Sequence, residues 1–307
     1  MTSNHRLLIA SLALATLPAS AAGEFTPVAE RPEIQSSAIS EASGLAVSPT
    51  NPHYMWVIND SGGTPDLHLM GIDGTDRGSV TLLDANNVDW EDLASFTLDG
   101  KSFLLVADTG DNHARHESSV FYIVREPELP AVGAKLKGAT RPAWQIQFRY
   151  EGGPRDCEAA AVDAVAEKII FISKRQSPPE VFELPLRAPK SAFVQTARKL
   201  SQTSVPSPAA KLIPFSNQPT GLDISQDRSL AAVITYYGVF LFPRHADETW
   251  AEALAKPPVV LQPHLLAQAE SVAFSKDGGT IYAISEGRKS PIVRYQRRAE
   301  ASIPPAP

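Results

Sequence analysis

Five residues with oxygen-bearing side chains occupy the same place in a repeated phrase of this sequence. Each phrase has a polar start and a short apolar run, and the phrases begin at residues 41, 89, 156, 218 and 268. Their third residues are Ser43, Glu91, Glu158, Thr220 and Glu270, at spacings of 48, 67, 62 and 50 residues. If the fold gathers them, three carboxylates repel one another unless a cation lies between them. An oxygen-only ligand set suits Ca²⁺ better than Zn²⁺, so these residues predict a calcium site.

A purely structural use of the same residues is the alternative. Polar groups at the start of a strand can bond to backbone amides, which requires no metal. The residues two places earlier in each phrase form a second polar set, namely Glu41, Asp89, Asp156, Gln218 and Gln268. Both interpretations require the phrases to meet in space, so they depend on the fold.

The apolar runs after each phrase indicate what brings the phrases together. Every phrase is followed by a second and a third apolar strand, and four of the five units show a fourth. We therefore predict an all-β fold, a five-bladed β-propeller with four antiparallel strands per blade. Six blades fit less well because the long inserts, Pro127–Pro142 and Ser201–Asn217, hold no further phrase, and a sandwich or a jelly roll does not predict the repetition. The last unit lacks a fourth strand, and we expect Phe25–Ile34 to supply it and close the ring.

Charged residues also follow the second strand of most units. Because the first two strands of a blade are antiparallel, the end of the second lies beside the start of the first. We therefore expect these catalytic candidates on the same face as the ion: Asp60, Asp108, Asp111, Lys174, Arg175, Glu286 and Arg288. Such a mixture of signs could present a cation and hydrogen-bond donors to a small anionic substrate or ligand. The alternative is ordinary turn chemistry with solvated charges.

Composition excludes several classes of function. The chain has 307 residues, of which 43% are hydrophobic and 20% charged, so it can bury a core. Its net charge of −6 argues against binding to nucleic acid. Cys157 is the only cysteine, which excludes intrachain disulfides, iron–sulfur clusters and cysteine-based zinc sites. The motifs of serine hydrolases, zincins and P-loop enzymes are absent.

The N-terminal residues resemble an export signal. His5 and Arg6 precede an apolar run that is too short to span a bilayer, and Ala19-Ser20-Ala21 fits a cleavage site. We therefore expect a signal peptide over residues 1–21, one propeller domain over 22–298, and a Pro-rich tail over 299–307. The predicted product is a periplasmic or secreted monomer with no membrane span.

Longer stretches of the sequence resemble known families. The residues Glu-Ala-Ser-Gly-Leu at 41, Trp-Val-Ile-Asn-Asp-Ser-Gly at 56, Asp-Trp-Glu-Asp-Leu-Ala at 89, Asp-Thr-Gly-Asp-Asn at 108 and Arg-Glu-Pro at 125 resemble a family of uncharacterised bacterial exported propellers. The ring order Ser43, Glu91, Glu158, Thr220, Glu270 is similar to the central calcium site of the calcium-activated nucleotidases (apyrases), which are secreted five-bladed propellers. The surrounding motifs of the nucleotidases are not evident. The resemblance therefore supports the metal ring more than the reaction.

Two functions from different classes follow from these features. The first is a calcium-dependent hydrolase of phosphate esters or anhydrides, with Lys174, Arg175 and Arg288 as charge stabilisers and Asp60, Asp108 or Glu286 as general base. The second is a non-catalytic propeller that binds a ligand or a protein, in which the ion only holds the blades together. The sequence selects no substrate.

Overall fold

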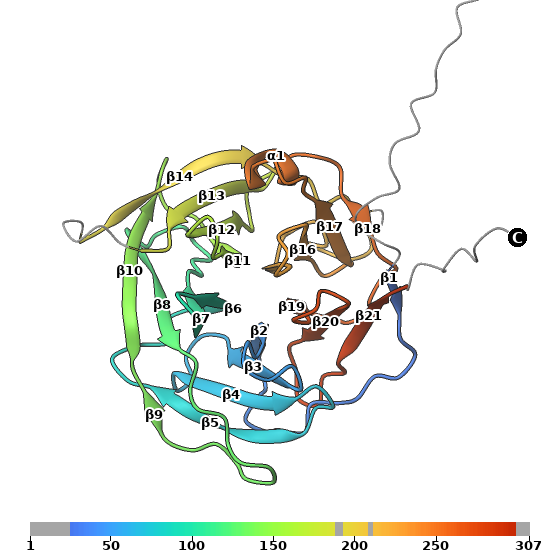
Figure 1. Cartoon of the computed structure of the whole chain (residues 1–307). Coiled ribbons are helices and arrows are strands. Elements are labelled where there is room, and N and C mark those ends of the chain that lie inside the picture. The colour runs from blue at the N-terminus through green and yellow to red at the C-terminus, as the bar shows by residue number, and fades with distance from the viewer. Residues whose placement is uncertain (1–24, 188–192, 208–210, 299–307) are drawn as a thin grey trace, which may run out of the picture.

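The protein is described by a computed structural model that covers residues 25–187, 193–207 and 211–298 (Figure 1). Within these ranges the chain consists of β-strands and a single short helix, α1 (Trp250–Leu254). No helix among the described residues is long and apolar enough to cross a bilayer. The predicted signal peptide and Pro-rich tail lie outside the described residues.

The strands form sets of four in chain order. The first set is β2 (Ala42–Val47), β3 (Tyr54–Asn59), β4 (Asp66–Gly71) and β5 (Asp76–Leu82). The second is β6 (Trp90–Leu98), β7 (Lys101–Asp108), β8 (Ser119–Arg125) and β10 (Pro142–Tyr150). The third is β11 (Cys157–Asp163), β12 (Lys168–Ser173), β13 (Glu180–Pro185) and β14 (Gln195–Gln202). Neighbours within each set are antiparallel, as the repeated phrase predicts.

Two further sets complete the pattern. The fourth is β15 (Gly221–Ile224), β16 (Leu230–Ile234), β17 (Val239–Pro243) and β18 (Val259–Val260). The fifth is β19 (Ala269–Phe274), β20 (Thr280–Ser285), β21 (Val293–Arg297) and β1 (Phe25–Pro27). Parallel pairing of β10 with β14 joins the second and third sets edge to edge into one eight-stranded sheet.

The five sets surround a common centre. The first strands of the phrases, β2, β6, β11, β15 and β19, contact one another in sequence, and β19 returns to β2. Figure 1 shows β2, β6, β11 and β19 nearest the centre, with β5, β10 and β14 on the outside. A separate apolar cluster fills the space between each pair of successive sets, including the pair formed by the last and the first. The fold is thus all-β, and its arrangement is consistent with the predicted propeller.

The inner strands have one unpaired edge, where backbone amides lack a partner in the sheet. Side chains near the centre form hydrogen bonds with some of these amides. The fully buried Asp92 carboxylate accepts hydrogen bonds from the amides of Ala160 at 2.7 Å and Leu222 at 3.0 Å, and so links β6 to β11 and β15. Asp223 accepts from the Phe274 amide at 2.7 Å and links β15 to β19. Gly44 permits close packing of β2 on β6, because a Cβ there would lie 2.6 Å from the Leu93 nitrogen.

The first long insert is more ordered than the sequence indicated. We expected only a loop over Pro127–Pro142, but it contains β9 (Ala139–Thr140), which pairs in parallel with β5. A bridge between Gly78 and Leu136 extends this contact. The insert therefore covers the outer edge of the first sheet, which a propeller blade otherwise leaves open.

The N-terminal strand closes the ring by pairing with the end of the chain. β1 is antiparallel to β21, with Phe25 opposite Arg297, and an isolated bridge joins Glu33 to Pro291. The Phe25 side chain is buried against the last two sheets, and the Arg297 guanidinium lies 5.1 Å from its ring centre. Part of the expected segment, Phe25–Ile34, therefore forms the outer strand of the last sheet.

We predict that deletion of residues 22–35 unfolds or aggregates the protein. The deletion removes β1 together with the buried side chains of Phe25 and Ile34, and replacing a single buried Phe by Ala already costs about 3–5 kcal/mol. Thermal unfolding and size-exclusion chromatography test this, with deletion of residues 299–307 as the control because it leaves β21 intact. An unchanged melting temperature after the N-terminal deletion would show that β1 does not hold the ring closed.

Candidate metal centre

In four of the five phrases the third residue lies at a bulge in its strand. In β2, β6, β11 and β19 the pairing register shifts at this place, so Ser43, Glu91, Glu158 and Glu270 have no partner across the ladder. Such bulges bend a strand and turn the affected side chain away from its regular direction. Thr220 lies just before β15, and its amide donates to the Ile234 carbonyl at 2.9 Å. All five ring residues are buried.

One backbone hydrogen bond recurs at this end of the molecule and brings the loops to the ring residues. The amides of Asp60, Thr109, Lys174 and Glu286, each just after a second strand, donate to the carbonyls of Glu41, Asp89, Asp156 and Gln268 respectively. The ends of the second strands therefore meet the starts of the first strands, as expected. We call this end of the ring the mouth.

The two hydroxyls of the ring bond to backbone. Ser43 Oγ donates to the Trp90 carbonyl at 2.8 Å, which connects the first and second sheets. Thr220 Oγ1 donates to the Ala269 carbonyl at 2.7 Å, which connects the fourth and fifth. These two residues thus bond to the backbone without a metal, although to carbonyls and not to the amides that the structural alternative named.

The carboxylates of the mouth form two groups that share Glu91. Ligand atoms of Asp60, Asp89 and Glu91 lie within 4.8 Å of one another, and so do those of Glu91, Asp156 and Glu158. Either group could hold a metal ion. We call them the outer triad and the inner triad respectively. Asp89 and Asp156, which sequence reasoning placed only in a second polar set, thus belong to the site, whereas Glu270 belongs to neither triad.

Gly110 makes room for the outer triad. A Cβ atom on this residue would lie 2.2 Å from Glu91 Oε1 and 2.4 Å from Asp89 Oδ2, which is closer than atoms can approach. Asn87 fixes the neighbouring loop, because its side-chain amide donates to the Asp60 carbonyl at 2.8 Å. The backbone around the outer triad is therefore arranged so that three carboxylates can converge.

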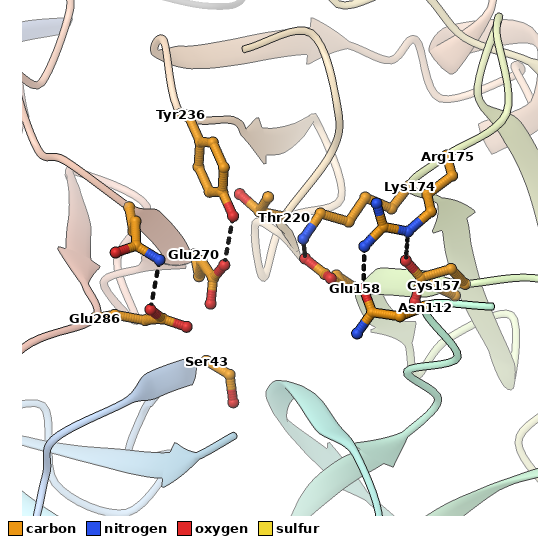
Figure 2. A network of polar contacts seen from close by, with 12 residues as sticks. Ser43, Asn112, Cys157, Glu158, Lys174, Arg175, Thr220, Tyr236, Glu270 and Glu286 are labelled. Atoms are coloured by element: carbon orange, nitrogen blue, oxygen red, sulfur yellow. Dashed lines mark hydrogen bonds and ion pairs between the residues drawn. The ribbon is translucent and has the colours of Figure 1, made fainter. Parts of the chain in front are cut away.

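The two triads differ in charge compensation. Lys174 Nζ forms an ion pair with Glu158 Oε2, and Arg175 Nε lies 2.5 Å from Asp156 Oδ2. Arg175 also donates to the Asn112 side chain (Figure 2). By contrast, no hydrogen bond or salt bridge among the described residues reaches the Glu91 carboxylate, which is only 4% exposed. The inner triad thus has two cations of its own, and the outer triad has none in the part of the chain described.

Burial and repulsion raise the pKa values of Asp89 and Glu91 in the outer triad. Burial, followed by the charges of Asp60 and Asp156, raises the pKa of Asp89 to about 6. Burial and the neighbouring Glu158 and Asp60 raise the pKa of Glu91 well above its ordinary value. Both shifts mean that the ionised forms are unfavourable where they stand. A bound cation would reverse that preference.

The opposite side of the mouth contains Glu270. It accepts a hydrogen bond from the Tyr236 hydroxyl at 2.9 Å, and the Lys174 ammonium lies 5.6 Å from the centre of the Tyr236 ring. Figure 2 shows Lys174 directed to Glu158 and Tyr236 directed to Glu270, from neighbouring sheets. The Glu286 carboxylate accepts a hydrogen bond from the side-chain amide of Gln268 at 2.7 Å. The sequence could have indicated Tyr236, because it lies in the loop after its second strand, as Asp60, Lys174 and Glu286 do after theirs.

The remaining catalytic candidates are mostly engaged in structural contacts. Asp108 accepts from the Asp89 amide at 2.9 Å, and burial raises its pKa to about 6. Asp111 accepts from the His116 amide at 2.7 Å, while its own amide donates to Asp156 at 2.9 Å. Arg288 is exposed. Asp108, Asp111 and Lys174 are therefore buried members of a network and not solvated loop charges.

A cavity of about 230 Å³ opens at the other end of the ring. Its lining includes Val47, Ser95, Val162, Asp163 and Phe274, where the first strands end. None of the five ring residues contributes to it. The five ring residues thus lie at the mouth, where the phrases begin, and not at this cavity.

Comparison with known proteins adds no functional assignment. No family model matches the sequence, and no curated protein is similar to it at a significant level.

Proposed function

We propose that this chain is an exported five-bladed β-propeller that binds Ca²⁺ at the mouth of its ring. The observation that carries the proposal is the outer triad, three convergent carboxylates without a compensating cation among the described residues. Transfer of an unpaired carboxylate from water into protein is unfavourable by several kcal/mol. A bound divalent cation removes that penalty, and the buried, unpartnered Glu91 is its most direct ligand.

The donor set supports calcium over other metals. The outer triad offers only carboxylate oxygens, and the nearby ring hydroxyls and backbone carbonyls are further hard oxygen donors. Zinc and copper prefer nitrogen or sulfur ligands, and the sole cysteine, Cys157, has its pKa raised to about 12 by burial. Magnesium usually retains several waters and binds few protein carboxylates. An oxygen-rich site with three carboxylates fits calcium best.

Hydrolysis of phosphate esters or anhydrides is the second candidate function. Lys174 and Arg175 lie beside the carboxylate groups, so positive charge stands close to the proposed ion. A bound calcium would supply charge neutralisation for phosphate oxygens. Both cations are already paired with Glu158 and Asp156, so an anionic substrate would compete with these carboxylates for them. The geometry therefore supports ion binding more directly than catalysis, and a non-catalytic binding propeller remains the alternative.

We predict that calcium raises the melting temperature and that chelation lowers it. A ligand at a hundredfold excess over its Kd stabilises the native state by about 2.7 kcal/mol, which corresponds to about 5–10 °C for a domain of this size. Glu91→Gln should abolish most of this dependence because it removes the carboxylate that both triads share. Differential scanning calorimetry with CaCl₂ and with EGTA provides the measurement.

The matched control for this experiment is Glu128→Gln, which changes an exposed carboxylate that belongs to neither triad. It should retain the full response to calcium. A wild-type melting temperature that is the same in calcium and in EGTA would contradict the proposed ion site.

We predict that the hydrolase function, if the chain has it, appears as calcium-dependent phosphate release from a panel of nucleotides and phosphate esters. Arg175→Ala should reduce the rate by about a hundredfold, the usual effect of removing one charge-stabilising group. Arg187→Ala is the control, because Arg187 pairs with Asp99 and Glu167 on the outer surface. Absence of phosphate release from every compound in calcium would leave the binding propeller as the function.

A further inference from the structure

Lys174 differs in charge from the residues at the corresponding places of the other sheets. The residues that directly follow the second strands at the mouth are Asp60, Thr109, Lys174 and Glu286, and in the fourth set Tyr236 comes two residues after β16. Four of them are acidic or neutral, and Lys174 alone carries a positive charge. The Lys174 amide donates a hydrogen bond to the Asp156 carbonyl at 2.9 Å. This bond holds the Lys174 backbone next to the inner triad.

The Lys174 side chain reaches into the ring and is held there. It is 7% exposed, and its partner Glu158 is 4% exposed, so the ion pair is almost dry. Tyr236 packs beside the ammonium with a separation of 5.6 Å from its ring centre. Although burial opposes it, the charge of Glu158 raises the pKa of Lys174, which favours the ammonium form.

The position of this ammonium has a consequence for the ion. A cation that used Glu158 would have to displace Lys174 and leave a buried ammonium without a partner, which is strongly unfavourable. Arg175 also pairs with Asp156, but its side chain is 36% exposed, so it can turn to solvent when a metal ion takes its place. Of the two triads, therefore, only the one formed by Asp60, Asp89 and Glu91 offers carboxylates without built-in cations among the described residues.

We infer that Lys174 is a built-in cation that fills the Glu158 side of the mouth and restricts calcium binding to one ion, held by Asp60, Asp89 and Glu91. This inference rests on the proposed function and specifies how the same site is regulated. A symmetric ring of five equivalent ligands is a different arrangement, because it would use Glu158 and Glu270 as fully as Glu91. Loss of Lys174 should free the inner triad for a second ion, with Glu91 as the shared carboxylate.

The experiment counts bound calcium by equilibrium dialysis of the purified whole protein. Wild type should bind one Ca²⁺ per chain and Lys174→Met two. The control is Lys168→Met, because Lys168 lies on β12 like the residues before Lys174 but pairs with Glu183 on β13. It should still bind one ion. A Lys174→Met protein that binds one ion with unchanged affinity would overturn the inference.

A second variant keeps the inference testable if Lys174→Met does not fold. Glu158→Gln removes the partner of Lys174 and should change the affinity for the first ion by less than about threefold, whereas Glu91→Gln should weaken it by more than a hundredfold. Equal losses in the two variants would favour the symmetric ring and contradict our assignment.

The two proposals fail in distinguishable ways. If wild type binds no calcium but Lys174→Met binds one ion, the role of Lys174 stands and the proposed calcium function of the native chain does not. If neither protein binds calcium, both proposals are wrong. If wild type binds one ion and all variants except Glu91→Gln behave like it, only the role of Lys174 is wrong.

Discussion

Repulsion among buried carboxylates is the constraint on which the rest of this structure depends. Asp89, Glu91, Asp156, Glu158 and Glu270 come from three of the five strand sets and meet at one end of the ring, and all except the half-buried Asp89 are buried. In water such groups ionise freely, but burial makes every unpaired charge costly. The protein must therefore supply opposite charge, give up ionisation, or bind a cation. On one side of the mouth, Lys174 and Arg175 supply the opposite charge. Among the described residues, no cation pairs with the outer triad.

The fold tolerates this crowding because other groups hold the ring together. Asp92 and Asp223 tie three pairs of inner strands through backbone amides, and Ser43 and Thr220 do the same through carbonyls. Five separate apolar clusters seal the joints between the sheets. Cohesion thus does not require an ion at the mouth. The carboxylates there can remain available for a ligand, which is the arrangement expected of a binding site on a rigid scaffold.

The sequence predicted those features that repeat. The phrase and its spacing identified the inner strands, the five ring residues and the closing strand at Phe25, because a repeated unit places equivalent residues at equivalent positions. It did not predict β9, since a two-residue strand in an insert has no periodic pattern. Nor did it predict that Asp89 joins Glu91 while Glu270 pairs with Tyr236. Those contacts depend on side-chain length and on the space that Gly110 leaves, and neither is visible in residue spacing.

The location of the bound ion tests the account most directly. Crystals grown in calcium and then exchanged with a lanthanide, whose anomalous scattering marks the ion, would show where it lies. We predict one principal peak within bonding distance of carboxylate oxygens from Asp60, Asp89 and Glu91, with the Lys174–Glu158 ion pair still intact. A peak on the ring axis that is shared equally by Glu91, Glu158 and Glu270, with Lys174 displaced, would contradict the assignment of the ion to the outer triad.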